Sequence, residues 1–222
     1  GAPNGAKTFE LRRENERHSL ALALRHQGQS NQVLMELAVE FLKNDNYVQY
    51  MTASRHPLEF IKYLKDNWTD PNGKNWNAVS KKIVVIDAFT THFGFTDSIH
   101  GKRTDQLKSE FGVDCINSSA TFAGIHTAAS EAFKKIQTKE AGGLRKPALV
   151  IYEDCFALAD LESVEQYRIF VRHVMPSERL WDAMFTVFAE TAQPDGEWGL
   201  VSSYASMMLD MRSHWPQDQN AA

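Results

Sequence analysis

The stretch SLALALRHQGQSNQVLMELAVEFLK, residues 19–43, decides the fold of this chain. A short apolar run, residues 20–24, leads into a polar segment, residues 26–33, that contains a glycine. Apolar side chains then recur at the spacing of one helix face, at Leu34, Leu37, Ala38, Phe41 and Leu42. A strand, a polar turn and an amphipathic helix, in this order, form the layout on which phosphate-binding loops are built.

Composition narrows the classes of function. The chain has 222 residues, 43% of them hydrophobic, which is enough for one α/β domain with its own core. Its net charge of −4 argues against nucleic-acid binding, because no basic excess is present to displace counterions from phosphates. No apolar run is long enough to span a membrane, although a membrane-anchored parent protein is compatible with the sequence. Cys115 and Cys155 match neither a metal site nor a disulfide framework, so we expect a reducing compartment, the cytoplasm.

We expect three segments, as part of a larger protein. Residues 1–18 are a charged lead-in, residues 19–212 a single α/β domain and residues 213–222 a tail. A weakly patterned stretch punctuated by glycines, about residues 90–120, predicts an insertion in this domain, with a short helix over residues 104–111.

Strands and helices are predicted to alternate along the domain. Strand-forming runs cover residues 47–52, 82–89, 147–154, 183–189 and 206–211. Helical patterns begin at Pro57 and cover residues 121–135 and 161–174, with Pro176 expected to end the last helix and residues 194–196 to form a turn. This alternation predicts an α/β fold, a mainly parallel sheet of about five or six strands with helices on both faces.

The second half of the chain extends this pattern. PALVIYED, residues 147–154, precedes CFALADLESVEQYRIFVRHV, and AMFTVFAET, residues 183–191, precedes SYASMMLDMR. In the order of these parts the chain resembles the RecA/KaiC-like branch of the P-loop NTPases over nearly its whole length. The resemblance implies a RecA-like three-layer sandwich, in which an acidic residue at a strand end positions Mg²⁺ and the attacking water. Glu153 and Asp154 occupy such a place, but IVVIDAF, residues 83–89, matches equally well through Asp87, so two candidates compete for one role.

The phosphate loop itself departs from the family pattern, G-x-x-x-x-G-K-[ST]. With the helix starts aligned, His26 and Asn31 stand at the two glycine positions. Gln32 stands at the lysine position and Val33 at that of the Mg²⁺-binding hydroxyl, so ATP with Mg²⁺ is disfavoured and we expect no cofactor. The loop is either a scaffold closed by its own side chains or a weak anion site. The residues that would serve such a site are Gly28, Ser30, Asn31 and Gln32.

Asp87, Glu153 and Asp154 are the candidate catalytic residues, because open α/β sheets bind ligands at the carboxyl ends of their strands. Around Asp87, a water-activating or metal site could also draw on Thr90, Thr91, His92 and Asp97. The alternative is that Asp87 only caps the next helix or loop. The histidines show no metal-site spacing, and we assign no metal ligand. Arg55 and His56 could face the same edge.

Two functional hypotheses remain. The first is a pseudo-ATPase, a catalytically degenerate P-loop-type domain that acts as a regulatory, scaffold or oligomerisation module through a protein partner or through self-association. The second is an atypical NTPase or metal-assisted phosphohydrolase that uses the acidic residues at the strand ends. Titration with ATP and Mg²⁺ would separate the two, because only the second predicts turnover.

Overall fold

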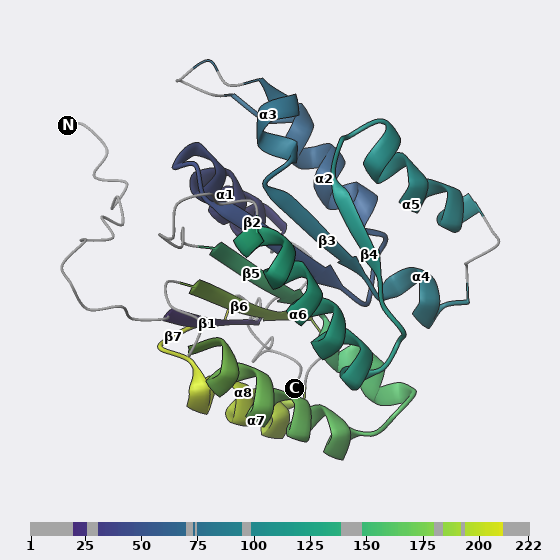
Figure 1. Cartoon of the computed structure of the whole chain (residues 1–222). Coiled ribbons are helices and arrows are strands. Elements are labelled where there is room, and N and C mark those ends of the chain that lie inside the picture. The colour runs from purple at the N-terminus through teal and green to yellow at the C-terminus, as the bar shows by residue number, and fades with distance from the viewer. Residues whose placement is uncertain are drawn as a thin grey trace, which may run out of the picture.

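The computed structural model describes residues 20–25, 31–69, 73, 75–94, 99–138, 148–179, 184–191 and 194–210, and within them seven strands form one sheet (Figure 1). The strands are β1 (Leu20–Arg25), β2 (Tyr47–Thr52), β3 (Ile83–Asp87), β4 (Asp114–Asn117), β5 (Ala148–Glu153), β6 (Met184–Glu190) and β7 (Met207–Asp210). The helices are α1 (Asn31–Lys43), α2 (Pro57–Asp66), α3 (Trp76–Ser80), α4 (Phe89–His92), α5 (Ile99–Ser109), α6 (Phe122–Thr138), α7 (Val164–Arg179) and α8 (Asp195–Tyr204), with a 3₁₀ helix, η1 (Cys155–Asp160).

The sheet has the order β4-β3-β2-β5-β6-β1-β7, and all its strand pairs are parallel. Helices cover both faces, as parallel sheets require. This is the predicted RecA-like α/β architecture, with seven strands where about five or six were expected. The first strand, β1, lies between the last two, β6 and β7, so the two ends of the domain meet at one side of the sheet.

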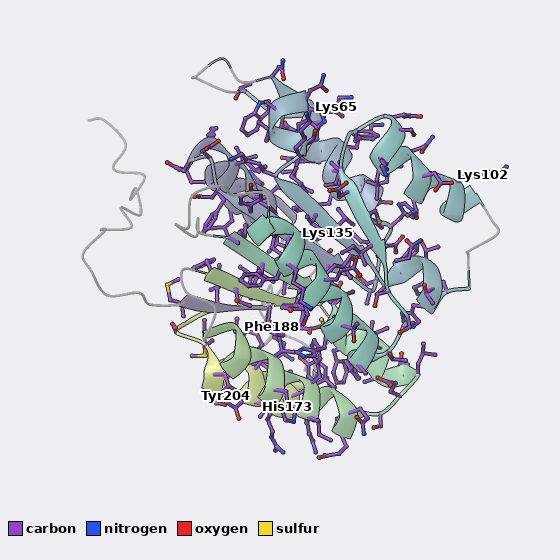
Figure 2. All side chains as sticks on the ribbon, in the orientation of Figure 1. Lys65, Lys102, Lys135, His173, Phe188 and Tyr204 are labelled. Carbon is purple, nitrogen blue, oxygen red and sulfur yellow. The ribbon has the colours of Figure 1, made fainter. Side chains whose placement is uncertain are left out.

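Two apolar layers hold the sheet between its helices. On one face, Leu24 of β1 and Tyr50 of β2 belong to a buried cluster with Leu34 of α1. On the other face, Tyr152 of β5 and Phe188 of β6 belong to a cluster completed by α6, α7 and α8. Figure 2 shows Phe188 between the sheet and these helices. Side chains alternate between the two layers along each strand, which fixes the register of the central strands.

The central strands explain why their sequence runs are almost continuously apolar. Every residue of β2, β3 and β5 is buried, because both faces of the sheet are covered. The helix after β2 begins at Pro57, as predicted, and His56 caps it by accepting a hydrogen bond from the backbone N–H of Leu58 at Nδ1 (3.1 Å).

Two boundary predictions are wrong. The helix α7 continues past Pro176 to Arg179, although proline lacks the backbone N–H of a helix interior and usually ends or kinks a helix. The segment 194–196 is a helix start rather than a turn, with Pro194 at the N-cap of α8. Asp195 and Glu197 lie in the first turn of α8, where negative charge is favourable.

The segment predicted as an insertion, residues 90–120, contributes most of α4, all of α5 and the edge strand β4. Its short predicted helix is α5, which begins earlier, at Ile99. We predicted no strand over Asp114–Asn117, which pairs with β3 only along its four residues.

Candidate functional site at the carboxyl edge of the sheet

The carboxyl ends of five adjacent strands bring the polar residues of the candidate site to one edge. These terminal residues are Asp87 of β3, Thr52 of β2, Glu153 of β5, Glu190 of β6 and Arg25 of β1. The parallel register places Thr52 beside both Asp87 and Glu153, and Arg25 beside Glu190. All five residues are buried. Sequence reasoning identified Asp87, Glu153 and the following Asp154 in this group, but not Glu190.

The predicted phosphate loop lies only partly within the described residues, because Gly28 and Ser30 fall outside them. The helix α1 begins at Asn31. The exposed side chain of Gln32 donates from Nε2 to Oε1 of Glu36 (3.0 Å), one turn along the same helix. Val33 is half-buried and packs against the apolar cluster beneath α1. At the positions aligned with the lysine and the hydroxyl, the chain therefore presents an amide bonded within its own helix and an apolar side chain.

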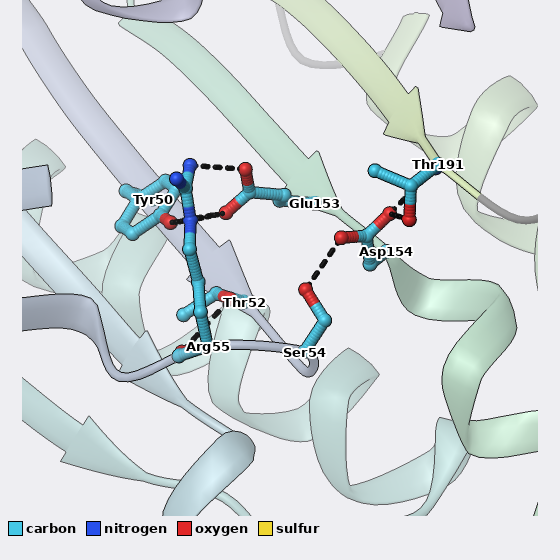
Figure 3. Close-up of polar contacts among 7 residues, drawn as sticks. All are labelled: Tyr50, Thr52, Ser54, Arg55, Glu153, Asp154 and Thr191. Atoms are coloured by element: carbon cyan, nitrogen blue, oxygen red, sulfur yellow. Dashed lines mark hydrogen bonds and ion pairs between the residues drawn. The ribbon is translucent and has the colours of Figure 1, made fainter. Parts of the chain in front are cut away.

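Arg55 and Tyr50 hold the carboxylate of Glu153 (Figure 3). Its Oε2 accepts a hydrogen bond from Nε of Arg55 (2.9 Å), and the Nη2 of Arg55 forms an ion pair with Oε1. The hydroxyl of Tyr50 also donates to Oε2. The Tyr50 ring stacks on Phe60 of α2 at a centroid distance of 3.9 Å, which holds its hydroxyl in place. Both oxygens of Glu153 thus have donors from the chain itself.

Burial and neighbouring charges both shift the pKa values of Glu153, Tyr50 and Arg55, and the two effects do not always act in the same direction. Burial raises the pKa of Glu153, and the positive charge of Arg55 opposes that rise. Burial also raises the pKa of Tyr50, and the negative charge of Glu153 raises it further. For Arg55, burial favours the neutral form, but the attraction of Tyr50 and Glu153 outweighs it and the pKa of the guanidinium is raised.

Asp154 ties three strand ends together. Its Oδ1 accepts hydrogen bonds from the backbone N–H and the hydroxyl of Thr191, both at 2.7 Å, and its Oδ2 accepts one from the hydroxyl of Ser54. Its own backbone N–H donates to the carbonyl oxygen of Ala189 (2.7 Å). The residue has a left-handed backbone, with φ of 51°, a conformation that aspartate tolerates better than most residues. Ser54 follows β2 and Thr191 follows β6, so the Asp154 carboxylate joins the loops on either side of β5 (Figure 3).

Glu190 is the candidate that sequence reasoning missed. It ends β6 and is 1% exposed. Its carboxyl group accepts hydrogen bonds from the backbone N–H of Phe156 (3.2 and 3.3 Å to its two oxygens) and from the hydroxyl of Tyr167 (3.2 Å). Burial raises its pKa well above the ordinary value, and the charges of Asp154 and Glu153 raise it further. The signal was present, since AMFTVFAE ends in an acid after an apolar run, as IVVID and ALVIYE do.

Asp87 is the centre of a second buried network. Its Oδ1 accepts a hydrogen bond from the backbone N–H of Thr90 (2.9 Å), and its Oδ2 accepts from the hydroxyls of Thr90 (2.7 Å) and Thr104 (2.8 Å). The Thr104 hydroxyl also lies 3.3 Å from Nε2 of His56. Because His56 accepts at Nδ1, the neutral ring carries its proton at Nε2 and donates it to Thr104. Asp87 therefore caps the segment after β3, the alternative to catalysis considered from the sequence.

The other residues proposed around Asp87 do not all lie beside it. Thr90 contacts it, whereas Nδ1 of His92 lies 3.1 Å from the carbonyl oxygen of Ala53. Asp97 lies outside the described residues. Arg55 and His56 both lie at the edge, one on the Glu153 side and one on the Asp87 side.

Arg25 connects the edge to α8. Its Nη1 donates to Oδ1 of Asp195 (2.6 Å), and its guanidinium lies 5.8 Å from the ring centroid of Trp198. Nearby, the half-buried Arg168 of α7 pairs with the buried Glu197 of α8 (2.5 Å). The positive charge at the end of β1 is thus directed toward a helix of its own domain.

Two kinds of feature, a metal-binding cluster and a membrane-spanning helix, are absent from the described residues. They contain no group of three or more histidine, cysteine, aspartate or glutamate side chains arranged to hold a metal ion. None of their helices combines the length and the apolar character needed to cross a membrane.

Sequence comparisons with known proteins do not show a family for this chain. No protein-family model matches the chain. A curated NAD-dependent protein deacetylase of Lactiplantibacillus plantarum is 25% identical over 134 residues, 59% of this chain and 57% of that protein. This chain therefore spans little more than half the length of that relative.

The architecture recurs in a solved structure. The crystal structure of the uncharacterized protein PH0321 from Pyrococcus horikoshii, in complex with an unknown peptide, superposes with a TM-score of 0.60 at 15% identity, over 89% of this chain and 79% of that chain. A second solved structure, an ATPase domain, gives a TM-score of 0.48 at 14% identity, over 86% of this chain and 68% of that chain. The likeness to PH0321 establishes a shared fold and nothing about activity.

Proposed function

We propose that this chain is a catalytically degenerate P-loop-type domain that acts as a regulatory or scaffold module by binding a protein partner. The observation that carries the proposal is that Glu153, Asp154, Asp87 and Glu190 each accept hydrogen bonds from at least two groups of the chain itself. A carboxylate that positions Mg²⁺ or activates water needs oxygen lone pairs directed at the ligand. In this chain those oxygens accept hydrogen bonds from other groups of the domain.

The start of α1 supports the same proposal. Gln32 has no charge to stabilise a transferring phosphoryl group, and its amide is bonded to Glu36. Val33 has no oxygen with which to bind Mg²⁺, and it packs against the core. Electrostatic stabilisation by a lysine and a metal ion supplies most of phosphoryl-transfer catalysis, so a domain without both is better suited to binding than to turnover.

Two of the similar proteins favour a peptide or protein ligand over a nucleic acid. PH0321 was crystallised with an unknown peptide, and the similar curated protein is named as a protein deacetylase. The net charge of −4 also favours a protein ligand, since it gives no attraction for phosphate backbones.

The test is calorimetric titration of the whole chain with ATP and Mg²⁺, and separately with NAD, combined with assays of phosphate and nicotinamide release. We expect no saturation up to about 1 mM nucleotide and no release of either product. Micromolar binding of ATP with turnover that Asp154→Asn abolishes would overturn the proposal in favour of an atypical NTPase. NAD-dependent release of nicotinamide would overturn it in favour of a deacetylase-like enzyme.

A further inference from the structure

The edge strand β7 exposes an unusual run of apolar side chains. Met207, Met208 and Leu209 are consecutive and are 37%, 64% and 40% exposed. Among the described residues, eight large apolar side chains are exposed, and these three are the only ones adjacent in sequence. Single exposed apolar residues are ordinary, whereas three in succession on an edge strand place apolar side chains on both sides of a backbone that a further strand could pair with.

The opposite edge of the sheet provides an internal comparison. β4 carries polar Asp114 and Asn117 at its two ends, and its Ile116 is buried at 8% exposure. That is the usual protection of a sheet edge, in which charge and polarity discourage pairing with another chain. β7 also ends in a charged residue, Asp210, but Met207, Met208 and Leu209 carry no charge and all three are exposed. The two edges of one sheet therefore differ in the exposure of their apolar side chains.

The pairing of β7 leaves one side of its backbone available. Among the strands of the described residues, only β1 pairs with it, through the register Leu22 to Met207, Ala23 to Met208 and Leu24 to Leu209. Neighbouring side chains of a strand point to opposite faces, so Met208 lies on one face of the sheet and its two neighbours lie on the other. A strand added beside β7 would meet apolar side chains on both faces.

The small size of this edge favours a short peptide over a folded protein as the ligand. Four residues of strand extend about 13 Å, and three partly exposed side chains can bury only a fraction of the about 800 Å² per partner of a stable interface between folded proteins. A second copy of this chain would need further contacts beyond this strand. A short extended peptide needs only main-chain hydrogen bonds and a few apolar contacts, and the flexible methionine side chains adapt to different residues.

We propose that β7 binds a short extended segment of a protein partner, apolar at consecutive positions, as an additional strand of the sheet. This inference rests on the partner-binding function proposed above and names its surface. The interaction would use the backbone of β7 for affinity and Met207, Met208 and Leu209 for selection of apolar sequences. The carboxyl edge and its carboxylates take no part in this interaction. Nucleotide titrations therefore test the proposed function, and peptide binding tests the proposed surface.

The experiment selects phage-displayed random heptapeptides on the full chain and measures the enriched peptides by fluorescence polarisation. The variant is Met208→Lys, which places a charge on the most exposed of the three side chains. Met208→Leu is the conservative control, and Tyr63→Lys is the matched control because Tyr63 is a 40% exposed apolar residue on α2. Circular dichroism verifies that all three variants fold, as expected for substitutions at exposed positions.

We expect apolar peptides to be enriched and to bind Met208→Lys at least about fivefold more weakly, with Met208→Leu and Tyr63→Lys close to the parent chain. Hydrogen exchange at residues 207–210 should slow when the peptide is bound. Equal affinity for Met208→Lys, absence of enriched peptides, or protection elsewhere in the sheet would overturn the assignment. So would a concentration-dependent dimer in sedimentation that Met208→Lys dissociates, because the occupant would then be a second copy.

Discussion

Replacement of Glu190 by glutamine tests whether this buried acid holds a proton in the folded domain. Burial raises the pKa of Glu190 well above its ordinary value, and Asp154 and Glu153 add to the effect. In the unfolded chain the same group titrates near its usual pKa of about 4.3. Between these two pKa values the folded state binds one proton more than the unfolded state. The free energy of unfolding must then fall as the pH rises through that window.

The magnitude follows from linkage. One extra proton in the folded state lowers the free energy of unfolding by up to about 1.4 kcal/mol for each pH unit within the window. Glu190→Gln has no proton to lose and keeps an oxygen that can accept from Phe156 and Tyr167. The variant should therefore gain stability relative to the parent chain as the pH rises above the unfolded-state pKa of about 4.3 toward the raised pKa of the folded state, with a difference that grows by up to about 1.4 kcal/mol per unit.

The assay is urea unfolding followed by tryptophan fluorescence across this pH range. Glu110→Gln is the control, since Glu110 is exposed after α5, and its stability should follow that of the parent chain at every pH. Glu153 also has a raised pKa, so the variant retains part of the pH dependence, and the difference between variant and parent isolates Glu190. A stability difference that is the same at both ends of the range would show that Glu190 binds equally many protons in the folded and the unfolded states, and the reasoning from burial would be refuted.

Three further changes probe the same edge. Arg55→Ala should lower the free energy of unfolding by about 3–5 kcal/mol, because it leaves the buried Glu153 without its counter-ion; urea unfolding measures this, and a loss below about 1 kcal/mol would contradict the importance of the pair. Thr104→Val should cost about 1–3 kcal/mol by the same measurement, because Asp87 loses one of its three donors, whereas an unchanged stability would mean that the hydrogen bond is unimportant. Gln32→Ala should change thermal stability little, because the side chain is exposed; a clear loss of stability in a thermal melt would show that its contact with Glu36 matters to the fold.

The architecture could be predicted because its signals are local and repeated. Strands buried on both faces are continuous apolar runs, and residues 47–52 were assigned with the bounds of β2. The boundaries that failed depend on context. Pro176 lies within α7 and Pro194 begins α8, and the same residue type is compatible with a helix end, a helix start or a turn. The edge strand β4 is short and pairs on one side, so it carries too little apolar pattern to be recognised.

The sequence indicated where the residues of the candidate site lie but not most of the hydrogen bonds that they form. Parallel strands deliver their final residues to one edge, so Asp87 and Glu153 could be placed there from sequence alone. Thr90, which was proposed beside Asp87, does contact it. The partners that are distant in sequence could not be predicted, because Thr104 is 17 residues from Asp87 and Arg55 is 98 residues from Glu153. Sequence reasoning considered His92 and Asp97 as partners of Asp87 from proximity in the chain. Contacts through α5 and through the loop after β2 are set by the packing of whole elements.

The contacts of the strand-end acids also support the proposal that this edge does not act in catalysis. A Mg²⁺ ion bound at Glu153 would compete with the hydrogen bonds from Arg55 and Tyr50, and displacing Arg55 would leave its guanidinium without this partner. Breaking a buried pair of this kind costs about 3–5 kcal/mol, which weakens a ligand by roughly two to four orders of magnitude unless new contacts compensate. Asp154 presents the same difficulty, since its release would detach the loops that carry Ser54 and Thr191. We therefore propose that partner binding uses a surface outside this edge, where the side chains have no contacts with the rest of the domain to give up.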